Sequence, residues 1–406
     1  MVALLSLFRK QRMWSPEEIR PRYDVVIVGG GVHGLAIAYE LAKLGVTDVA
    51  VLEKSYIGAG GSGRNTAIIR SNYRTEPGVE FYDESLKIYE QLAVELDYNL
   101  LFSQHGHLTF AHTEAGIVGL RVRAETNQVL GVNSRIIDLK EIAELVPALD
   151  LSDRPRHPIM AALYHPPGGT IRHDAVVWGY ARAASRRGVA IHTGVEVTGV
   201  NVAAGAVTGV ETNRGTIHAG VVVNATAGWA TTIAAMAGVR LPIVTHPLQA
   251  MVTEPLKPIL NPVLVSATLH VYVNQTDRGE LVIGSEIDPY SSYSHRSTLP
   301  FLESTVRHAL ELLPAAANAR VLRQWAGICD MTPDFGPIIG TVPEVRGFVV
   351  DVGWGTYGFK AAPAAGRRTA ELIATGRTPD VIAPFTIERF ANNQPLGEKA
   401  AAAVSH

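Results

Sequence analysis

A strand, a glycine-rich turn, a helix and a second strand follow one another between residues 25 and 53. Residues 25–28 form an apolar run typical of a buried strand, and Gly29, Gly31 and Gly34 lie in the turn after it. In such a turn the first glycine permits the bend, the second lets the backbone approach a pyrophosphate, and the third allows close packing of helix on strand. The order of these features predicts an α/β unit that binds a dinucleotide.

The segment after the turn supports the same interpretation. Apolar residues recur at helical spacing through 36–44, Gly45 is a stop signal, and residues 49–52 form a second apolar run that ends in Glu53. An acid at this strand end is placed to accept ribose hydroxyls, and it favours FAD or NAD over a 2′-phosphorylated cofactor. Tight turns alone explain many glycine patterns, but here the flanking elements agree with the functional interpretation.

Composition limits the remaining possibilities. The chain has 406 residues, of which 47% are hydrophobic and 18% charged, so it is long enough for two domains. Its formal charge of -2 gives no reason to expect a nucleic-acid partner. The single cysteine, Cys329, excludes an internal disulfide framework and a cysteine-cluster metal site, and we predict no bound metal.

The N-terminal residues argue against export. Residues 2–8 are apolar, but Arg9, Lys10 and Arg12 follow them, which is the wrong order for a signal peptide. No stretch approaches the about 20 apolar residues that cross a bilayer. We therefore predict a cytoplasmic protein without a membrane partner. The first 22 residues lie outside the nucleotide unit, and the sequence favours neither a frayed tail nor an arm that packs on a partner.

Further along, the chain is predicted to divide into two interleaved domains. Apolar runs at 221–223 and 347–352 are typical of buried strands, whereas alternating stretches at 270–273 and 281–284 indicate an antiparallel sheet. We predict an α/β fold of the α+β two-domain type, a Rossmann-like nucleotide domain interleaved with an antiparallel-sheet substrate domain. The predicted bounds are 1–22 for an N-terminal arm, 23–85, 166–229 and 326–390 for the nucleotide domain, 86–165 and 230–325 for the substrate domain, and 391–406 for a tail.

Two more elements complete the predicted nucleotide domain. A strand-helix unit is expected around 170–199, and a closing helix is expected to begin near Pro363 and to end near Gly376.

Four motifs carry a family resemblance over nearly the whole chain. They are the unit at 29–53, the run GGSGRNTAIIRSNY at 60–73, the run GTIRHDA at 169–175, and the run GWGTYGFK at 353–360. Together they resemble the D-amino-acid oxidase and sarcosine oxidase superfamily of FAD-dependent proteins, and they look most like the beta subunits of heterotetrameric sarcosine oxidases. The resemblance implies a D-amino-acid oxidase-like fold and noncovalent FAD.

The resemblance and the glycine motifs together predict which residues surround the flavins. Small residues at 60–66 let the backbone approach FAD, while Arg64 and Asn65 offer hydrogen-bond donors; the alternative is a merely flexible glycine loop. The predicted flavin-binding residues are Gly29, Gly31, Val32, His33, Gly34, Glu53, Lys54, Gly60, Gly61, Ser62, Arg64, Asn65, Thr66, Ile69, His173, Val197, Ala225, Gly228, Gly353, Gly355, Gly358, Phe359 and Lys360.

The resemblance also implies which residues hold the substrate. Arg70 and Lys360 match family positions that bind a carboxylate, and a guanidinium and an ammonium would fix an amino acid above the flavin in one orientation. Taken alone, each is more often a solvated surface charge. His270 and Tyr272 occupy alternating positions of a predicted strand and are candidates for managing the amine proton, although ordinary core packing is the favoured interpretation of both.

His173 is the most distinctive single residue. Its surroundings match the histidine that carries covalent FMN in these beta subunits; the alternatives are a helix-start residue or a site that has lost its flavin. Related monomeric enzymes instead attach FAD to a cysteine four residues before a Met-Thr-Pro run, where this chain has Gly327, so Cys329 is predicted to be a buried structural thiol. The strand at 281–283 also lacks the lysine that those enzymes use to activate oxygen.

The predicted activity is oxidation of sarcosine to glycine and formaldehyde, with hydrogen peroxide as the other product. Electrons would pass from FAD to FMN, and tetrahydrofolate would be an alternative acceptor of the methylene group. The resemblance implies alpha, gamma and delta subunits as partners in a heterotetramer. Two alternatives stay open: a beta-like subunit of a proline, dimethylglycine or opine dehydrogenase or oxidase, and a noncatalytic flavin-binding electron-transfer subunit.

Overall fold

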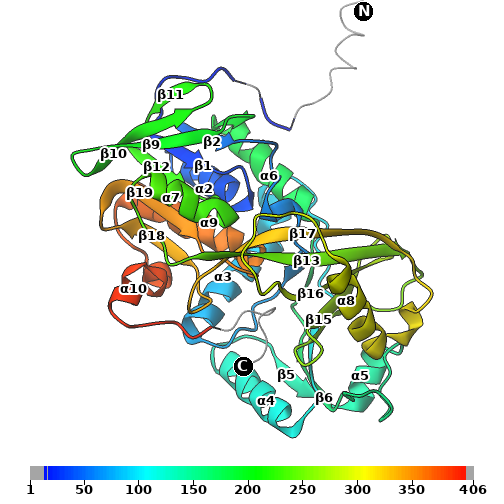
Figure 1. The fold of residues 1–406 in the computed structure, drawn as a ribbon. Coiled ribbons are helices and arrows are strands. Elements are labelled where there is room, and N and C mark those ends of the chain that lie inside the picture. Colours follow the sequence, from blue (N-terminus) through cyan, green and yellow to red (C-terminus); the bar gives the residue numbers. More distant parts are fainter. Residues whose placement is uncertain (1–12, 16, 399–406) are drawn as a thin grey trace, which may run out of the picture.

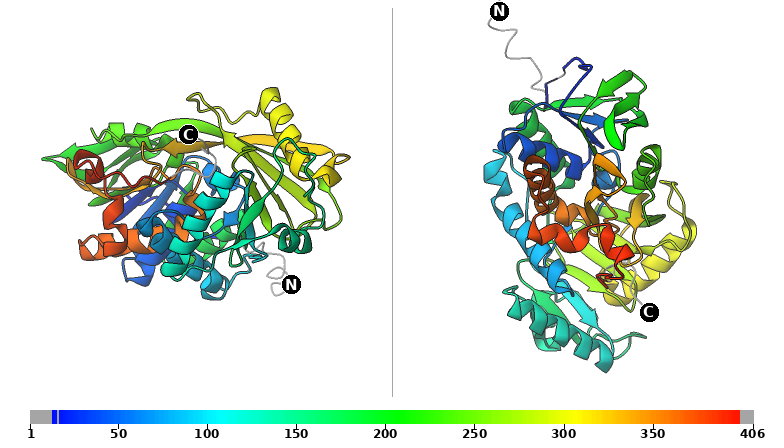
Figure 2. Two further views of the ribbon diagram at one scale, coloured as in Figure 1. Left: turned by 90° about the horizontal axis from the view of Figure 1, so that it is seen from below. Right: turned by 90° about the vertical axis from the view of Figure 1, so that its left-hand side faces the viewer.

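Two sheets organise residues 13–15 and 17–398, which the computed structural model describes (Figure 1). A nine-stranded sheet has the order β11-β10-β19-β12-β1-β2-β8, with β18 beside β19 and β9 beside β10. An eight-stranded sheet has the order β17-β13-β16-β15-β14-β4-β6-β5. The two sheets lie toward opposite ends of an elongated molecule, and two further views show the same separation (Figure 2).

The nine-stranded sheet has a parallel centre made of β19, β12, β1, β2 and β8. Both faces of this centre are covered, so its strands are continuous apolar runs. Val25 and Ile27 face one core, and Val26 and Val28 face the other. The strands are β1 (Val25–Val28), β2 (Val49–Glu53), β8 (Ala190–Thr193), β9 (Val197–Ala203), β10 (Ala206–Thr212), β11 (Gly215–His218), β12 (Val221–Asn224), β18 (Ile338–Val342) and β19 (Val345–Val352).

Four helices form a layer on one face of this sheet: α2 (Val32–Lys43), α3 (Glu76–Glu95), α6 (His173–Arg186) and α9 (Gly358–Thr375). α2 packs against both α6 and α9. At Gly366 of α9 an added Cβ would lie 2.5 Å from the Ala36 Cβ, so α2 and α9 meet almost backbone to backbone. The short α7 (Ala230–Met236) belongs to the core on the other face.

The eight-stranded sheet also has two different faces. Leu108, Leu264 and Val273 point into an apolar core that α8 (Leu299–Leu312) covers. The residues that alternate with them along each strand point to the opposite face of the sheet, here called the inner face. Its strands are β4 (His107–Ala111), β5 (Arg135–Ile137), β6 (Ala161–His165), β13 (Val244–Pro255), β14 (Val263–Ser266), β15 (Val271–Gln275), β16 (Glu280–Ile287) and β17 (Val321–Met331). The remaining α-helices are α4 (Glu114–Val129), α5 (Leu139–Leu145) and α10 (Glu388–Ala391).

A small two-stranded sheet joins two of the sequence motifs. In it β3 (Ile68–Ile69) pairs with β7 (Gly169–Thr170) in antiparallel register. The Ile171 backbone N–H also donates to the Ala67 carbonyl at 3.1 Å. The chain just before Arg70 therefore lies beside the chain just before His173.

Most of the elements expected from the sequence are present. The first strand, turn and helix, the strand-helix unit at 170–199, and the antiparallel strands around 271 and 281 are confirmed. The predicted start of the closing helix at Pro363 is wrong, because α9 begins at Gly358. Pro363 has no N–H for the Phe359 carbonyl, and the Tyr89 hydroxyl donates to that carbonyl instead, at 2.6 Å. The predicted end holds, with Gly376 in a left-handed conformation.

The predicted domain boundaries remain a prediction. The boundary between residues 85 and 86 falls inside α3, and the one between 325 and 326 falls inside β17. Of the predicted arm, residues 1–12 and 16 lie outside the described residues, and Arg22 forms a bridge with His218. Of the predicted tail, residues 399–406 lie outside the described residues, while Glu398 is buried against Thr75.

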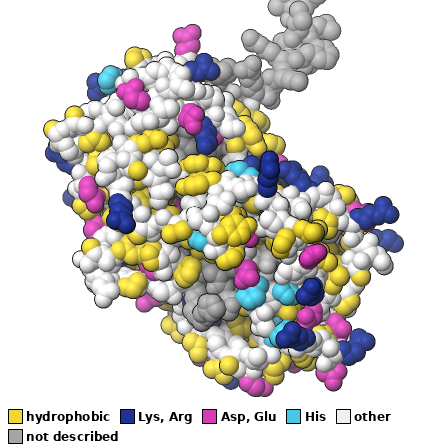
Figure 3. All heavy atoms as spheres, viewed as in Figure 1, with side chains coloured by type: hydrophobic (Ala, Val, Ile, Leu, Met, Phe, Trp, Pro, Cys, Tyr) yellow, Lys and Arg dark blue, Asp and Glu magenta, His cyan; other side chains and the backbone are white. Residues whose placement is uncertain are grey.

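The surface charges are mixed in sign, as the near-zero formal charge of the chain predicts. On the face shown in Figure 3, basic and acidic side chains are interspersed rather than gathered by sign. Among residues 13–15 and 17–398, no helix is both long and apolar enough to cross a membrane.

A buried ion pair fixes the end of the chain to the loop after β17. Arg389 donates to Asp334 through Nε at 2.8 Å and Nη2 at 3.0 Å, and both side chains are less than a tenth exposed. Burial alone raises the pKa of Asp334, but Arg389 and backbone donors outweigh it and hold the pKa below its usual value. The carboxylate therefore stabilises the fold above its unfolded-state pKa, and this contribution disappears as the pH falls through the lower folded-state pKa.

Replacing Arg389 by methionine leaves a buried carboxylate unpaired. We expect Arg389→Met to lower the free energy of unfolding by about 3–5 kcal/mol near neutral pH, with a smaller loss in acid. Urea denaturation of both proteins measures this difference. The control is Arg154→Met, which removes an exposed partner of Asp150 and should not shift the midpoint. Equal losses of stability in Arg389→Met and Arg154→Met would show that the buried ion pair has no special stabilising effect.

Candidate active site

A cavity of about 620 Å³ lies where the carboxyl ends of β1 and β2 meet the inner face of the eight-stranded sheet. Most of the residues predicted to bind a flavin or substrate line it. These are Gly29, Gly31, Val32, His33, Glu53, Lys54, Gly60, Gly61, Ser62, Arg64, Asn65, Thr66, Arg70, Val197, Ala225, Tyr272, Gly355, Gly358, Phe359 and Lys360. Those that do not line it are Gly34, Ile69, His173, Gly228, His270 and Gly353.

Backbone crowding explains why the first turn needs glycine. Gly29 has a φ of +113°, and an added Cβ would lie 2.5 Å from the Ala225 carbonyl oxygen. A Cβ at Gly34 would lie 2.0 Å from the Gly29 carbonyl oxygen, so this residue allows α2 to pack on β1 without itself reaching the cavity. The turn thus brings the first N–H groups of α2 to the cavity edge, where an anion is favoured.

The Glu53 carboxylate is held by backbone donors at the end of β2. Its Oε2 accepts from the Gly30 N–H at 3.0 Å, and its Oε1 accepts from the Ser55 N–H at 2.8 Å. Both donors belong to loops that line or border the cavity. The side chain therefore has a fixed position facing the space where a ribose was predicted.

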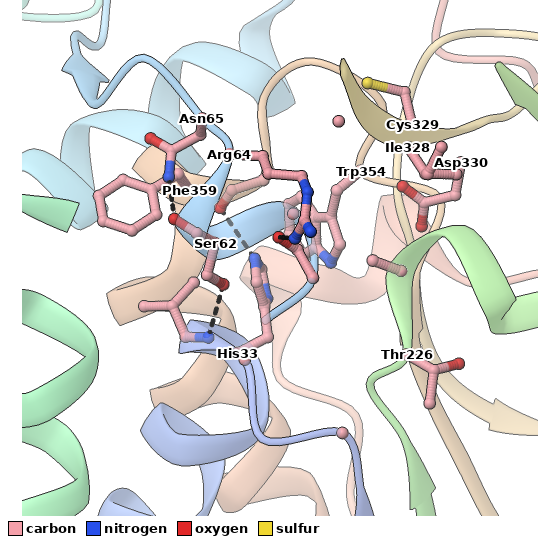
Figure 4. Close-up of a pocket in the computed structure, with 18 of the residues that line it drawn as sticks. His33, Ser62, Arg64, Asn65, Thr226, Ile328, Cys329, Asp330, Trp354 and Phe359 are labelled. Atoms are coloured by element: carbon pink, nitrogen blue, oxygen red, sulfur yellow. Dashed lines mark hydrogen bonds between the residues drawn. The ribbon is translucent and has the colours of Figure 1, made fainter. Parts of the chain in front are cut away.

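The 60–66 segment folds back over the start of α2. Ser62 Oγ accepts from the Val32 N–H at 2.9 Å, and the Ser62 carbonyl accepts from the Asn65 amide, as Figure 4 shows. Arg64 Nη1 donates to the Gly60 carbonyl at 3.1 Å, and the Arg64 carbonyl accepts from Trp325 Nε1 at 2.8 Å. These bonds place the loop between the two sheets.

His33 bridges the first turn to the glycine-rich segment after β19. Its Nδ1 lies 3.2 Å from Asp351 Oδ2, and its Nε2 lies 2.8 Å from the Gly358 carbonyl oxygen. Burial alone lowers the pKa of His33, but the Asp351 carboxylate and the Gly358 carbonyl outweigh it and raise the pKa. Because both nitrogens face acceptors, the imidazole is held as a double donor, and it fixes the start of α9.

Asp330 was missed by the sequence reasoning. It is buried at the cavity edge, and its Oδ2 accepts from the Gly353 N–H at 2.6 Å and its Oδ1 from the Gly355 N–H at 3.3 Å. Burial raises the pKa of Asp330 to about 6, although the backbone donors oppose this. The carboxylate shapes the turn that leads into α9, a function that no local sequence signal indicated.

Arg70 enters the cavity from the end of β3 and is 6% exposed. Its Nη1 donates to the Asn72 carbonyl at 3.1 Å and to the Asn72 side-chain oxygen at 3.0 Å. The guanidinium carbon lies 4.4 Å from the centre of the Tyr73 ring. Neutral groups therefore hold the guanidinium in place.

Lys360 lies in the first turn of α9 and is 8% exposed. Its Nζ is 3.4 Å from the Thr356 carbonyl oxygen and 5.6 Å from the centre of the Tyr357 ring. Burial, with a contribution from the Arg70 charge, lowers the pKa of Lys360 to about 7. Within the described chain, no carboxylate lies within ion-pair distance of Arg70 or Lys360.

Tyr272 and His270, expected to face the substrate together, are separated by the structure. The Tyr272 ring lies across Gly284 on the neighbouring strand, where an added Cβ would be 2.1 Å from the hydroxyl, and it lines the cavity. Burial raises the pKa of Tyr272 to about 12, so the phenol is neutral. His270 belongs to the turn before β15, its Nδ1 lies 3.1 Å from Glu286 Oε2, and it does not line the cavity, so its predicted role at the substrate stays a prediction.

His173, at the first position of α6, is half-buried. It does not line the cavity. Burial lowers the pKa of His173, although the neighbouring Asp174 opposes this, so the imidazole is neutral near pH 7.

The other predicted residues outside the cavity lining support its walls. Gly228 packs on Ile328, Gly353 donates its N–H to Asp330, and Ile69 is fully buried beside Arg70. Cys329 is buried as predicted, and it also lines the cavity. Burial raises the pKa of its thiol, so the sulfur is uncharged.

His107 is a second cavity residue that the sequence reasoning missed. It begins β4, is 2% exposed and lines the cavity on the inner face of the eight-stranded sheet. The signal that could have found it is the alternation of polar and apolar residues in His107-Leu108-Thr109-Phe110.

Comparisons with known proteins agree with this geometry. The chain is 44% identical over 397 residues to "Sarcosine oxidase subunit beta" of Rhodobacter capsulatus, which covers 98% of this chain and 95% of that one. It is 46% identical over 395 residues to the protein of the same name from Arthrobacter sp, with 97% of each chain covered. These relatives confirm the predicted resemblance to sarcosine oxidase beta subunits.

A solved structure and a family model confirm the predicted fold. The crystal structure of L-proline dehydrogenase from P.horikoshii superimposes with a TM-score of 0.88 and 31% identity, covering 93% of this chain and 100% of that one. The family model described as "FAD dependent oxidoreductase" matches residues 24–372. The chain therefore belongs to the family of FAD-dependent oxidoreductases.

Proposed function

We propose that this chain is the catalytic beta subunit of a sarcosine oxidase, which converts sarcosine to glycine and formaldehyde and produces hydrogen peroxide. The observation that carries the proposal is the pair of buried cations, Arg70 and Lys360, which line one cavity and have only neutral groups as contacts. Such a pair fits a ligand that brings its own carboxylate. The names of the similar relatives support the choice of sarcosine.

The residues along the rest of the cavity fit FAD. Gly29 and Gly31 line the cavity at the start of α2, which suits a pyrophosphate, and the fixed Glu53 carboxylate suits a ribose. When bound, FAD accepts the hydride from the carbon beside the amine nitrogen. Phe359 and Lys360 at the start of α9 line the same cavity, which supports a carboxylate site beside the flavin.

The two cations bind the carboxylate in complementary ways. The Arg70 guanidinium offers a flat fork of donors, and the Lys360 ammonium adds a compact charge. Because Lys360 has a pKa of about 7 without substrate, an arriving carboxylate stabilises its charged form. Held at the carboxylate, a small amino acid has its amine and adjacent carbon directed along the cavity, toward the residues of the sheet.

A second flavin, FMN, is proposed to be joined covalently to His173. The imidazole is neutral, as a nucleophile must be, and it is half-buried at the start of α6, outside the FAD cavity. FMN there would supply the site at which oxygen takes up the electrons. The β3 and β7 pairing supports a connection between the two sites, because it joins the backbones that lead to Arg70 and His173.

The word "subunit" in the names of the similar relatives supports an assembly with other chains. We propose alpha, gamma and delta subunits as the partners, with tetrahydrofolate as a second acceptor for the methylene group. The two-domain division and the cytoplasmic location predicted from the sequence belong to the same proposal.

A proline dehydrogenase is the second candidate, because the similar solved structure is an L-proline dehydrogenase. The same cations would bind the proline carboxylate, and only the shape of the pocket around the amine would differ. Substrate turnover distinguishes the two.

Sarcosine should bleach the flavin of the purified protein, prepared with any neighbouring subunits, under anaerobic conditions. Admission of oxygen should then restore the spectrum and yield one hydrogen peroxide per sarcosine consumed. Flavin absorbance and a peroxidase-coupled assay measure the two steps. Bleaching by proline alone would favour the second candidate, and bleaching only by dithionite would show a noncatalytic electron-transfer subunit.

Lys360 should make carboxylate binding dependent on pH. The ammonium is charged below its pKa of about 7, so the affinity for butyrate, which has no amine, should fall as the pH rises from about 6 to about 9. Lys360→Met should bind butyrate about 10- to 100-fold more weakly at the lower pH and show no such fall, as loss of a hydrogen bond to a charged group predicts. Perturbation of flavin absorbance measures the dissociation constants.

The control for the Lys360 substitution is Lys87→Met, which removes an exposed lysine of α3 and should leave butyrate binding unchanged. Arg70→Met should weaken binding at every pH, because a guanidinium keeps its charge across this range. A pH dependence that survives in Lys360→Met would contradict the assignment.

Acid precipitation should separate the two flavins. FAD should appear in the supernatant, and FMN should remain on the peptide that contains His173, which mass analysis can identify. His173→Asn should lose the bound FMN and oxygen reduction but keep FAD and its bleaching by sarcosine. FAD alone, with no flavin on the peptide, would refute the covalent FMN.

A further inference from the structure

The inner face of the eight-stranded sheet carries three buried polar atoms without a hydrogen-bond partner in the described part of the chain. They are His107 Nδ1, Thr109 Oγ1 and Asn274 Nδ2. A buried polar group without a partner costs about 1–3 kcal/mol, so each requires an explanation. Among the three residues, only His107 lines the cavity.

Strand pairing fixes the position of His107. It lies opposite Val263 of β14 on one side and opposite His165 of β6 on the other. Behind it, an added Cβ at Gly168 would lie 2.7 Å from the His107 Cβ, so the chain closes tightly around the base of the side chain. His107 and Tyr272 therefore contribute fixed rings to the floor of the cavity, on strands separated only by β14.

The surroundings of His107 keep its imidazole neutral. Burial, and then the nearby positive charges of Arg70, Arg123 and Lys360, lower the pKa of His107 well below its usual value. Because Nδ1 is fully buried, Nε2 is the nitrogen that a molecule in the cavity can reach, and with the proton on Nδ1 the lone pair of Nε2 accepts a hydrogen bond.

His165 shows that the missing partner is particular to His107. Its Nδ1 lies 2.8 Å from the Asn133 carbonyl oxygen, and its Nε2 accepts from the Ser71 N–H at 3.3 Å. It does not line the cavity. His165, whose nitrogens both have protein partners, is therefore structural. His107 instead lines the cavity that Arg70 and Lys360 also line.

We propose that His107 binds the amine of the substrate, its neutral imidazole accepting a hydrogen bond from the substrate N–H while Arg70 and Lys360 hold the carboxylate. The inference rests on the proposed oxidation of an amino acid and adds the residue that recognises its nitrogen. It also predicts specificity: a primary or secondary amine keeps an N–H in its neutral form, whereas a tertiary amine has none.

Sarcosine and butyrate form the matched pair of ligands for the test, because butyrate replaces the amine NH by CH₂ at the same chain length. In the complete complex, equilibrium perturbation of flavin absorbance gives the dissociation constant of butyrate. The dependence of the anaerobic reduction rate on sarcosine concentration, or of the absorbance change where no reduction occurs, gives that of sarcosine. The ratio of the two constants reports the contact with nitrogen. We expect His107→Leu to weaken sarcosine binding about tenfold or more and to leave butyrate binding within about twofold. It should also reduce the preference for sarcosine over N,N-dimethylglycine.

Two further variants separate recognition from folding. His107→Gln keeps an acceptor and should restore most of the sarcosine affinity, and Thr109→Val removes the neighbouring polar atom of the same face and should change neither ligand. Retention of FAD shows that each variant is folded. Unchanged sarcosine affinity in His107→Leu, or equal losses for both ligands, would overturn the proposal.

The wild-type protein separates this inference from the proposed activity. If sarcosine binds more tightly than butyrate through His107 but never reduces the flavin, the proposed oxidation fails and the amine contact stands. If sarcosine binds no better than butyrate, the amine contact itself is refuted, whatever the substrate oxidised.

Discussion

Two positive charges buried without an anion are the constraint on which the site depends. Removing an ion from water costs several kcal/mol unless another charge compensates for it. The fold compensates for this cost only partly. The Asn72 carbonyl and the Tyr73 ring contact Arg70, and the Thr356 carbonyl and the Tyr357 ring contact Lys360. Burial still lowers the pKa of Lys360 to about 7. In the proposed function, a ligand carboxylate supplies the missing charge, so its binding releases a cost already present in the folded protein. On that proposal, burial of the cations turns fold stability into substrate affinity.

The cofactor turn and the carboxylate site are parts of one rigid arrangement. His33, from the glycine turn, bonds to Asp351 at the end of β19 and to the Gly358 carbonyl at the start of α9. Asp330, from β17, fixes the turn between them through backbone N–H groups. Lys360 lies two residues after Gly358, so its position depends on bonds made by the same loop that forms the nucleotide site. Geometry at a reacting centre must hold to a fraction of an ångström, and these bonds provide that precision.

The sequence predicts the parts that depend on local order and misses those that depend on distant pairing. The glycine turn, Glu53 and the segment at 60–66 could be found because their motifs follow one another in a fixed order along one short stretch of the chain. The alternation at 107–110 indicates the face of His107 but not its neighbours, because these are set by pairing with Val263 and His165, both far along the chain. The start of α9 was placed too late for a similar reason: the carbonyl that Pro363 leaves free is satisfied by Tyr89 of another helix. At His270 the local pattern misleads instead. The alternation at 270–273 predicts that the strand includes His270, but β15 begins at Val271 and His270 still belongs to the turn.

The inner face of the eight-stranded sheet explains how one fold can serve different amines. Arg70 and Lys360 come from the nucleotide-binding side and are fixed by bonds to its loops, whereas His107 and Tyr272 come from β4 and β15 of the other sheet. Changes on those strands alter the pocket around the nitrogen without disturbing the carboxylate site, because the two sets of residues share no hydrogen bond in the described chain. A neutral imidazole also avoids adding another positive charge beside Arg70, Arg123 and Lys360. The proposed recognition of a carboxylate by charge and of an amine by a neutral acceptor fits this division of the cavity.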